Sequence, residues 1–383
     1  MWTAPIGPEQ GAGLPRLGAL ALSLTLLAAP LLGGTAYAGS SDHVGPGARG
    51  HHPAHAPSWR ETVVDPGQSF RGLDAVSRRT AWVTGGGATA TDPGRVFRTT
   101  DGGRTWADVS PPATEGLLFR DVEARSATRA VILAIGSGEA SRIYRTTDGG
   151  ATWRTTFVNT DPAAFYDCMA SFPGGRRGLV VGDPVDGRFQ VLATRDFGRS
   201  WVRLPDDGMP EAPTEFGFAA SGDCLVTAGH TAYFGSGGGA SRIFRSVDRG
   251  RTWTATDSTI PPGESAGVFA LAFRTPWRGV AVGGDFTAPA DGVDAVATTR
   301  NGRTWHNTGD LTHLAEDVAY LPTRRHGLIA TGESGDVMGT SVSLDEGRTW
   351  ERVSDLGYHA LDCTHDRSCW AAGGNGRVAR LVR

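Results

Sequence analysis

The sequence contains no lysine, so arginine and histidine are its only basic side chains. Its 37 arginines are outnumbered by 40 acidic residues, which gives a formal net charge of −3 at pH 7. Nucleic-acid-binding domains and polybasic membrane anchors carry an excess of basic charge, and the chain as a whole has none. We therefore expect no nucleic acid among its partners.

Cysteine is also scarce, and no two of the four cysteines form a C-x-x-C pair. This excludes a thioredoxin-like motif and a zinc ribbon. In an exported chain, four cysteines are compatible with two disulfides. Cys363 and Cys369 flank a short turn and form the first predicted pair, which leaves Cys168 with Cys224. The alternative for the second pair is two free, buried thiols.

Long apolar runs are missing except near the N-terminus. Arg16 precedes an apolar run over residues 19–32, and Ala36-Tyr37-Ala38 forms an A-x-A cleavage pattern. This arrangement predicts a signal peptide over residues 1–38, an extracytoplasmic mature protein, and no stable membrane insertion after cleavage. An uncleaved anchor is the alternative, although Pro30 interrupts the run, which is short for a spanning helix.

Residues 39–57 are rich in glycine, histidine and proline, which predicts a flexible linker. Histidines at positions 43, 51, 52 and 55 raise the alternative of a transition-metal site, but a solvated tail is the favoured interpretation. We expect neither a metal site nor a cofactor.

One octet recurs along most of the chain. Its first copy is Thr99–Trp106 (TTDGGRTW), and further copies begin at Thr146, Thr194, Ser246, Thr298 and Ser343. Successive octet tryptophans are 47, 48, 52, 52 and 45 residues apart, a period typical of a four-stranded sheet used as a repeating unit. The 55 glycines and 22 prolines indicate many tight turns. Together these features predict a β-propeller.

The octet is predicted to be the turn between the third and fourth strands of each unit. Its aspartate accepts hydrogen bonds from the backbone of its own turn, Gly103 takes a left-handed conformation, and the tryptophan packs as an apolar plug. The aspartates are Asp101, Asp148, Asp196, Asp248 and Asp345, and the tryptophans are Trp106, Trp153, Trp201, Trp253, Trp305 and Trp350. In the fifth copy Arg300 occupies the aspartate position, and we expect Asn301 to rescue the turn.

The pattern S/T-x-D-x-G-x-[ST]-W resembles the Asp-box or BNR repeat of sialidase-like propellers and of photosystem II assembly-factor propellers. The resemblance covers almost all of the mature chain. It implies a propeller of four-stranded blades, with strands A to D counted outward from the central channel, in which the octets are structural.

Six octets are expected to belong to seven blades. The C-terminal segment supplies three strands, over residues 358–363, 368–373 and 376–381, and the chain stops where a seventh octet would begin. Ser58–Val63 resembles the residues that follow an octet. We therefore predict an all-β, seven-bladed propeller over residues 58–383 whose last blade is completed by the N-terminal strand, which removes an open edge.

The functional site is expected on the face opposite the octets, where the A strands begin and the B–C loops lie. Aligning the A strands, with Glu215-Phe216-Gly217-Phe218 taken as that of blade 4, places eight polar residues near the channel mouth. The ligand-binding candidates are Arg71, Arg120, Asp317 and His359, and the catalytic candidates are Tyr166, Glu316, Asp121 and Asp167. The alternative is a polar, water-filled channel with internal ion pairs.

Two functions follow from the resemblance. The first is an exported, monomeric binding or assembly scaffold that holds a protein or glycan partner through the loops of this face. The alternative is a carbohydrate-active enzyme, a sialidase-like hydrolase or a lyase, with its site in the central funnel. Sialidases use an arginine triad, a tyrosine nucleophile with a glutamate partner, an aspartate acid/base and an F/Y-R-I-P motif. Phe70-Arg71-Gly72-Leu73 keeps only the first two residues of that motif.

Two other enzyme signatures are not expected to function. Residues 263–267 fit the G-x-S-x-G pattern but precede a predicted strand instead of joining a strand to a helix. Residues 235–240 imitate a dinucleotide-binding loop without a βαβ unit.

The carbohydrate-active-enzyme hypothesis requires Arg71, Arg120, Tyr166 and an acidic residue to converge on one pocket.

Overall fold

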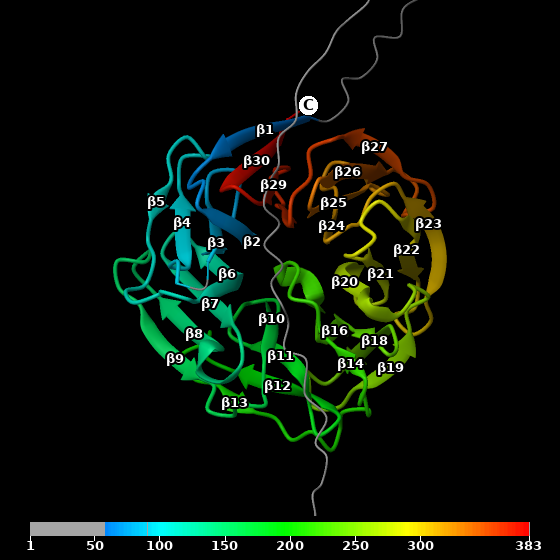
Figure 1. The fold of residues 1–383 in the computed structure, drawn as a ribbon, viewed down its shortest axis with the longest axis horizontal. Helices are drawn as coiled ribbons and strands as arrows, with labels where there is room; N and C mark the ends of the chain where they lie inside the picture. The colour runs from blue at the N-terminus through cyan, green and yellow to red at the C-terminus, as the bar shows by residue number, and fades with distance from the viewer. Residues whose placement is uncertain (1–57, 90, 383) are drawn as a thin grey trace, which may run out of the picture. The chain divides into compact units, whose positions relative to one another are not determined.

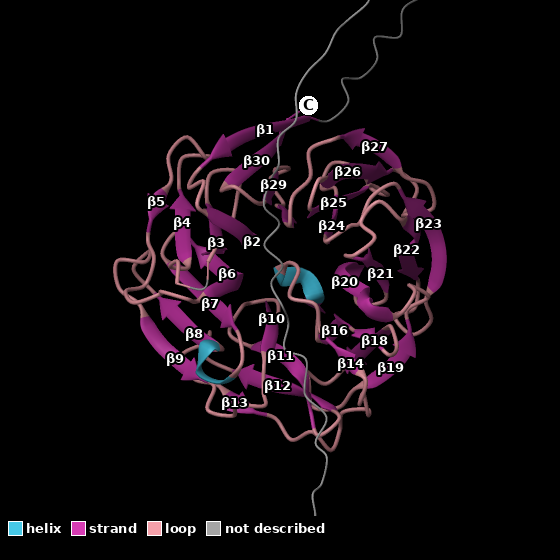
Figure 2. Ribbon diagram, viewed as in Figure 1, coloured by secondary structure: helices cyan, strands magenta, loops and turns pink. Residues whose placement is uncertain are grey.

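The computed structural model describes residues 58–89 and 91–382, so the predicted signal peptide and linker lie outside the described residues. Seven antiparallel sheets form a ring around a central channel (Figure 1). The regular structure is almost entirely strand, with two short 3-10 helices (Figure 2). The prediction of a seven-bladed propeller with four-stranded blades is confirmed.

The first three blades follow one another in the sequence, each ordered from its inner strand A to its outer strand D. Blade 1 contains β2 (Gln68–Ala75), β3 (Ala81–Gly87), β4 (Arg95–Thr99) and β5 (Ala107–Asp108). Blade 2 contains β6 (Leu118–Ser126), β7 (Arg129–Ile135), β8 (Arg142–Thr146) and β9 (Arg154–Val158), with η1 (Gly138–Ala140) in its B–C loop. Blade 3 contains β10 (Tyr166–Ser171), β11 (Gly178–Val185), β12 (Arg188–Thr194) and β13 (Val202–Arg203).

Blades 4 to 6 continue this order, with one elaboration. Blade 4 contains β15 (Leu225–Ala228), β16 (Thr231–Gly235), β18 (Arg242–Ser246) and β19 (Thr254–Asp257). Blade 5 contains β20 (Gly263–Thr275), β21 (Arg278–Asp285), β22 (Gly292–Thr299) and β23 (His306–Leu311), and it is extended inward by β17 (Gly237–Gly238) and β14 (Glu215–Phe216). Blade 6 contains β24 (Asp317–Tyr320), β25 (Leu328–Ser334), β26 (Val337–Ser343) and β27 (Glu351–Ser354).

Blade 7 joins the two ends of the propeller. Its inner strands are β28 (Ala360–Cys363), β29 (Cys369–Ala372) and β30 (Arg377–Val382), and its outer strand is β1 (Ser58–Val63), which pairs with β30 (Figure 1). The antiparallel register runs from Ser58 opposite Val382 to Val63 opposite Arg377. The predicted N-terminal closing strand is therefore confirmed.

The core lies between neighbouring blades. In one cluster, Trp82 and Val96 of blade 1 pack against Phe119 and Ile132 of blade 2. This arrangement follows from the sequence because both faces of each sheet are covered, so the inner strands are apolar on both sides. The burial of large apolar side chains between sheets supplies most of the driving force for folding.

The octets fold as predicted at the C–D turns. In the fourth octet the Asp248 carboxylate accepts hydrogen bonds from Ser246 Oγ at 2.8 Å, the backbone N–H groups of Arg251 and Thr252 at 3.0 and 2.9 Å, and Thr252 Oγ1 at 2.7 Å. In the first octet Gly103 has φ of +81°, a conformation that favours glycine.

The fifth octet lacks the aspartate, and its turn is one residue shorter than the turns of the other octets. Asn301 Oδ1 accepts hydrogen bonds from the N–H groups of Arg303 and Thr304 at 2.8 and 2.9 Å, as the aspartate does elsewhere. Thr299, one residue later than the first octet position, supplies the hydroxyl that accepts from Gly302 N. Arg300 is left at the tip of the turn with an exposed side chain.

Arginines near the end of strand C in blades 1, 2 and 7 each donate a hydrogen bond to the octet of the next blade. The guanidinium groups of Arg98, Arg145 and Arg380 donate to octet carbonyls of the next blade at 2.9, 2.7 and 3.2 Å, those of Gly149, Phe197 and Gly102 respectively. The octets therefore stabilise contacts between blades as well as their own turns.

We expect Asp248→Ala to lower the free energy of unfolding by about 2 kcal/mol, because the backbone and hydroxyl donors of the turn lose a charged acceptor. Asp257→Ala is the matched control, since Asp257 is exposed at the end of β19. Denaturant unfolding of both variants measures the difference. Equal stability of the two would show that the octet carboxylate does not fasten the turn.

Candidate functional site

A ring of side chains points into the channel from bulges in the inner strands. The pairing of strand A with strand B skips one residue at Arg71, Arg120, Asp167 and Phe269, in blades 1, 2, 3 and 5. A bulge leaves one residue unpaired and re-aims its side chain. All four of these residues line one cavity on the face opposite the octets, which we call the funnel.

Tyr166 does not lie in this ring. It is 3% exposed, packs in the core between blades 2 and 3, and meets Phe157 edge-to-face at 5.5 Å. Tyr166 occupies the position of Phe119, so Asp167 is the counterpart of Arg120 and the A-strand alignment of blade 3 was shifted by one residue.

Blade 4 departs from the predicted alignment. Its inner strand is β15, whereas Glu215–Phe216 forms β14 and pairs with β17 at the inner edge of the blade 5 sheet. The connection over residues 204–224 ends in η2 (Gly222–Cys224), which lies in the middle of the ring (Figure 2) and contacts β2, β6, β10 and β20. The predicted start of blade 4 was therefore wrong. Residues 215–218 look like a strand in the sequence, but they belong to an insertion whose last part fills the channel.

Two arginines and a disulfide hold this plug in place. Arg71 and Arg120 each donate from Nη1 at 3.0 Å, to the carbonyls of Ala220 and Ala219 respectively. Cys224 at the end of η2 is bonded to Cys168 on β10. A second disulfide joins Cys363 to Cys369 across the A–B turn of blade 7. No free cysteine occurs in the part of the chain that is described.

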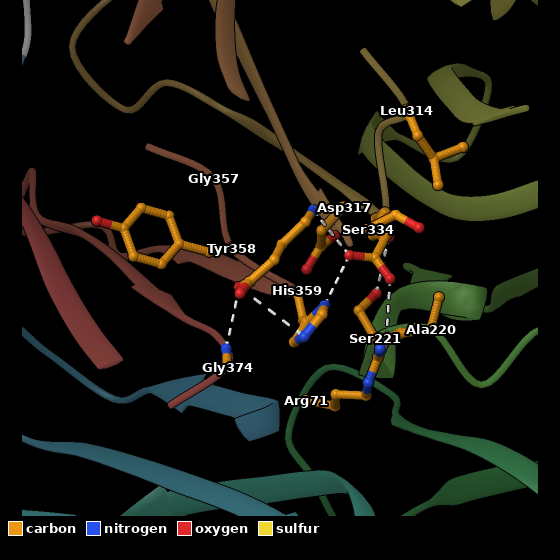
Figure 3. A network of polar contacts seen from close by, with 12 residues as sticks. Arg71, Ala220, Ser221, Leu314, Asp317, Ser334, Gly357, Tyr358, His359 and Gly374 are labelled. Carbon is orange, nitrogen blue, oxygen red and sulfur yellow. Dashed lines mark hydrogen bonds and ion pairs between the residues drawn. The ribbon is translucent and has the colours of Figure 1, made fainter. Parts of the chain in front are cut away.

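One wall of the funnel is a chain of polar contacts between blades 1, 6 and 7, in which Arg71 and Arg377 are the cations (Figure 3). Glu316 accepts from Arg71 at 2.8 Å and contacts His359 Nδ1 at 2.7 Å. Glu333 continues the chain, 3.8 Å from His359 Nε2 and 2.7 Å from Arg377. These charges neutralise one another, as the internal ion-pair alternative predicts.

The Glu316 carboxylate is ionised despite its burial. Burial by itself raises the pKa of Glu316, but His359, Arg71 and the bond from Glu333 N hold it down to about 2. Burial lowers the pKa of His359 and outweighs the opposing effect of Glu316. The permanent charge of Arg71, which donates to Glu316 at 2.8 Å, thus holds this wall together.

The opposite side of the funnel holds polar groups with spare hydrogen-bonding capacity. Burial, followed by the charge of Arg71, lowers the pKa of Arg120 to about 9, so its guanidinium is still charged at neutral pH. Within the described ranges no carboxylate lies within 4 Å of Arg120. Asp167 Oδ2 is buried without a partner there, and burial together with Asp183 raises the pKa of Asp167.

The funnel combines these groups with an aromatic wall. Its volume is about 730 Å³, and it opens between the plug and the B–C loops of blades 5 and 6. Five phenylalanines line it, namely Phe165, Phe216, Phe218, Phe269 and Phe286. A cavity of this size that combines an aromatic wall with convergent polar groups is typical of a ligand site. The phenylalanines and Asp183 were not among the candidates, because only polar residues of the aligned A strands were selected and Asp183 was assigned to a B–C loop.

Asp121 and Asp317 lie below the funnel and accept backbone hydrogen bonds. Asp121 accepts from Met169 N at 2.5 Å, and Asp317 accepts from Leu361 N at 2.7 Å. Of the eight sequence candidates, the structure thus brings five to the funnel, Arg71, Arg120, Asp167, Glu316 and His359. Asp121, Asp317 and Tyr166 lie elsewhere.

Buried carboxyl groups are concentrated around the lower side of η2. Burial and then the charges of Asp317 and Asp362 raise the pKa of Asp223, and burial raises that of Asp317 to about 8. A raised carboxyl pKa means that the native state binds a proton more tightly than the unfolded chain. Its stabilising effect is complete at low pH and is lost as the pH rises toward the folded-state value.

We therefore expect Asp223→Asn to stabilise the protein at alkaline pH, since an amide stays neutral and still donates toward Asp317. The melting temperature of this variant should exceed that of the wild type at about pH 9 and match it near pH 4. Asp257→Asn, at an exposed position, is the control. Parallel pH profiles for Asp223→Asn and the wild type would contradict the buried carboxyl assignment.

Other site types receive no support from residues 58–89 and 91–382. No group of three or more histidine, cysteine, aspartate or glutamate side chains in these ranges is placed to hold a metal ion. The same ranges contain no helix that is long and apolar enough to span a membrane.

The comparisons with known proteins agree with this architecture. No protein-family model and no curated protein matches the chain. Among solved structures, it is similar to YCF48 bound to D1 peptide, with a TM-score of 0.60 and 16% identity over 85% of this chain and 97% of that one. These likenesses show a β-propeller fold.

Two further structures support the same conclusion. YCF48 from Cyanidioschyzon merolae has a TM-score of 0.56 and 15% identity, over 84% of this chain and 98% of that chain. The Pan2 WD40 domain of Neurospora crassa has a TM-score of 0.53 and 11% identity, over 84% and 94% of the two chains. The likeness therefore extends to a WD40 propeller, and it does not by itself identify an Asp-box family.

Proposed function

We propose that this chain is an exported scaffold that binds a peptide segment of a protein partner in the funnel. The observation that carries the proposal is the pairing of a phenylalanine wall with the Arg120 guanidinium, which has no carboxylate within 4 Å among the described residues. A peptide supplies apolar side chains for the wall, and a carboxylate or carbonyl oxygen for the Arg120 guanidinium. The similar structure of YCF48 holds a D1 peptide, which supports a peptide as the ligand class.

The geometry favours binding over glycosidic chemistry. The enzyme hypothesis needs Tyr166 beside Arg71 and Arg120, but Tyr166 is in the core and Arg71 is bound to Glu316. Neither a tyrosine nucleophile nor an arginine triad lies at the funnel in the described part of the chain. A glycan partner stays a possible outcome of the experiment below.

Selection from a random peptide library provides the test. Phe286, 48% exposed on the funnel, is replaced by alanine, and Val202, 64% exposed on an outer strand, gives the control Val202→Ala. We expect enriched peptides to bind Phe286→Ala at least about tenfold more weakly than the wild type, and Val202→Ala unchanged. Equal affinity for all three proteins, or enrichment on a glycan array with no peptide selected, would overturn the proposal.

Export is part of the same proposal. The mature protein should be recovered from the extracytoplasmic fraction with Gly39 as its first residue, since cleavage is predicted after Ala38. N-terminal sequencing measures this directly. Recovery of the intact N-terminus from the cytoplasm would rule out export without affecting the funnel.

A further inference from the structure

Charge is segregated between the two faces of the propeller. The D–A and B–C connections, which end on the funnel face, contain 15 acidic residues and no arginine. The A–B connections and the six octets contain 15 arginines and seven acidic residues. We call this second surface the octet face. The net charge of −3 conceals the difference, because the two excesses have opposite signs and partly cancel.

The A–B connections and octets lie side by side on one surface. Backbone hydrogen bonds join the octet to the A–B turn of the same blade, from Gly102 N to Arg79 O and from Glu346 N to His326 O. The A–B turn of blade 5 lies against blade 4, because Tyr233 of blade 4 donates to Pro276 O at 2.6 Å. The octet face is therefore continuous from blade 4 to blade 5.

The positive charge of the octet face is mostly unpaired. Among the described residues, Arg300 alone of these 15 arginines is within 4 Å of a carboxylate, at 3.9 Å from Glu346. Glu346 is shared with Arg278 and His326. The octet aspartates are engaged by their own turns, as Asp248 illustrates. The surface therefore has a large cationic excess available to an anionic partner.

Three exposed apolar side chains project from the same surface on consecutive blades. Val247 and Leu344, 54% and 61% exposed, occupy the second position of the octets of blades 4 and 6. Trp277, 55% exposed, is at the A–B turn of blade 5. The other nine described tryptophans are buried or half-buried. Arg278 beside Trp277 contacts Glu346 of the blade 6 octet at 3.5 Å, so the tips of blades 5 and 6 are neighbours on this surface.

We propose that the octet face docks peripherally on an anionic lipid bilayer through blades 4 to 6. Tryptophan favours the membrane interface, and arginines near the surface are attracted to anionic headgroups. The apolar tips stand on separate turns, so they can enter a fluid headgroup layer without a shape-matched pocket. A nucleic acid would use the arginines and give the apolar tips no role. Docking in this orientation turns the funnel away from the membrane. The membrane proposal is therefore independent of what the funnel binds.

Vesicle sedimentation tests the proposal. We expect the protein to sediment with mixed phosphatidylcholine–phosphatidylglycerol vesicles more than with phosphatidylcholine alone, and less as salt rises. Removing two exposed arginines with Arg324→Ala/Arg325→Ala should weaken this binding, roughly fivefold for each charge. The control Arg60→Ala/Arg154→Ala removes the same charge from exposed outer-strand positions.

A second variant tests the apolar tips. Bromine-labelled lipid should quench tryptophan fluorescence of the wild type, and Trp277→Ala should lose this quenching and bind more weakly. Phe286→Ala, which removes an exposed aromatic from the funnel face, should behave as the wild type. All variants are made in the full chain, so any contribution of the apolar run over 19–32 is equal in each.

The result that overturns the proposal is vesicle binding that is absent, or that is the same for the wild type, Arg324→Ala/Arg325→Ala and Trp277→Ala. Binding to DNA that exceeds binding to anionic vesicles and ignores Trp277→Ala would assign the surface to a soluble polyanion instead. Circular dichroism verifies that each variant is folded. Neither outcome affects peptide selection at the funnel, so the two proposals fail separately.

Discussion

Removal of Ser58–Val63 should cost the propeller at least about 5 kcal/mol of unfolding free energy, which is a large part of the stability of an ordinary domain. The deletion exposes the whole edge of β30, with which β1 pairs over six residues. It also removes Trp59, which is 9% exposed, packs on Tyr358 with ring centroids 5.1 Å apart, and donates to Thr340 Oγ1 at 2.9 Å. We expect a strongly lowered melting temperature and aggregation through the open edge.

Two point variants separate closure from a general effect of the deletion. Trp59→Ala should cost about 3 kcal/mol, because it empties a buried site between blades 6 and 7. Arg60→Ala, at an exposed position of the same strand, should leave the melting temperature unchanged. Thermal unfolding followed by circular dichroism measures all three. A deletion variant that melts with the wild type would show that β1 does not close the ring.

Loss of the Cys168–Cys224 disulfide should have the next largest effect. The bond joins residues 56 apart in the sequence, and the entropy of closing such a loop corresponds to about 4 kcal/mol. It also fixes η2 in the channel, since Cys224 is the last residue of that helix. The double variant Cys168→Ala/Cys224→Ala should therefore unfold at lower denaturant concentration and exchange amide hydrogens faster around residues 219–226.

The second disulfide is the internal control for this prediction. Cys363 and Cys369 are six residues apart, so their removal should cost only about 2 kcal/mol. It should leave exchange near η2 unchanged, because this bond is confined to the A–B turn of blade 7. If the two double variants were equally stable and showed the same exchange near η2, the longer disulfide would not be holding the plug.

The architecture was predictable because the repeat encodes it locally. Each octet contains all the groups that its turn needs, so its presence fixes the end of strand C and the start of strand D. Ser58–Val63 was recognisable as a closing strand because it resembles the residues after an octet, and the structure pairs it with β30. Even the irregular fifth octet followed local rules, with Asn301 accepting in place of an aspartate.

The site was less predictable because its geometry depends on contacts across the channel. A bulge moves a side chain from the core into the channel. Because the alignment of the blade 3 strand was shifted by one residue, Tyr166 was chosen as a funnel candidate beside Asp167, although only Asp167 is at the bulge. The insertion before blade 4 has no counterpart in the repeat, so its segment over residues 215–218 was mistaken for a blade strand and η2 was not predicted. Net charge likewise hid the segregation of charge, which emerges only when connections are assigned to faces.

The central claim is that the funnel face binds the partner. Hydrogen–deuterium exchange of the protein with and without a peptide enriched by selection tests it most directly. We predict slower exchange in the residues that form the funnel, over 215–220, 264–269 and 333–335, and unchanged exchange in the octets. Protection confined to the octets and A–B turns, with none in these three segments, would contradict the account.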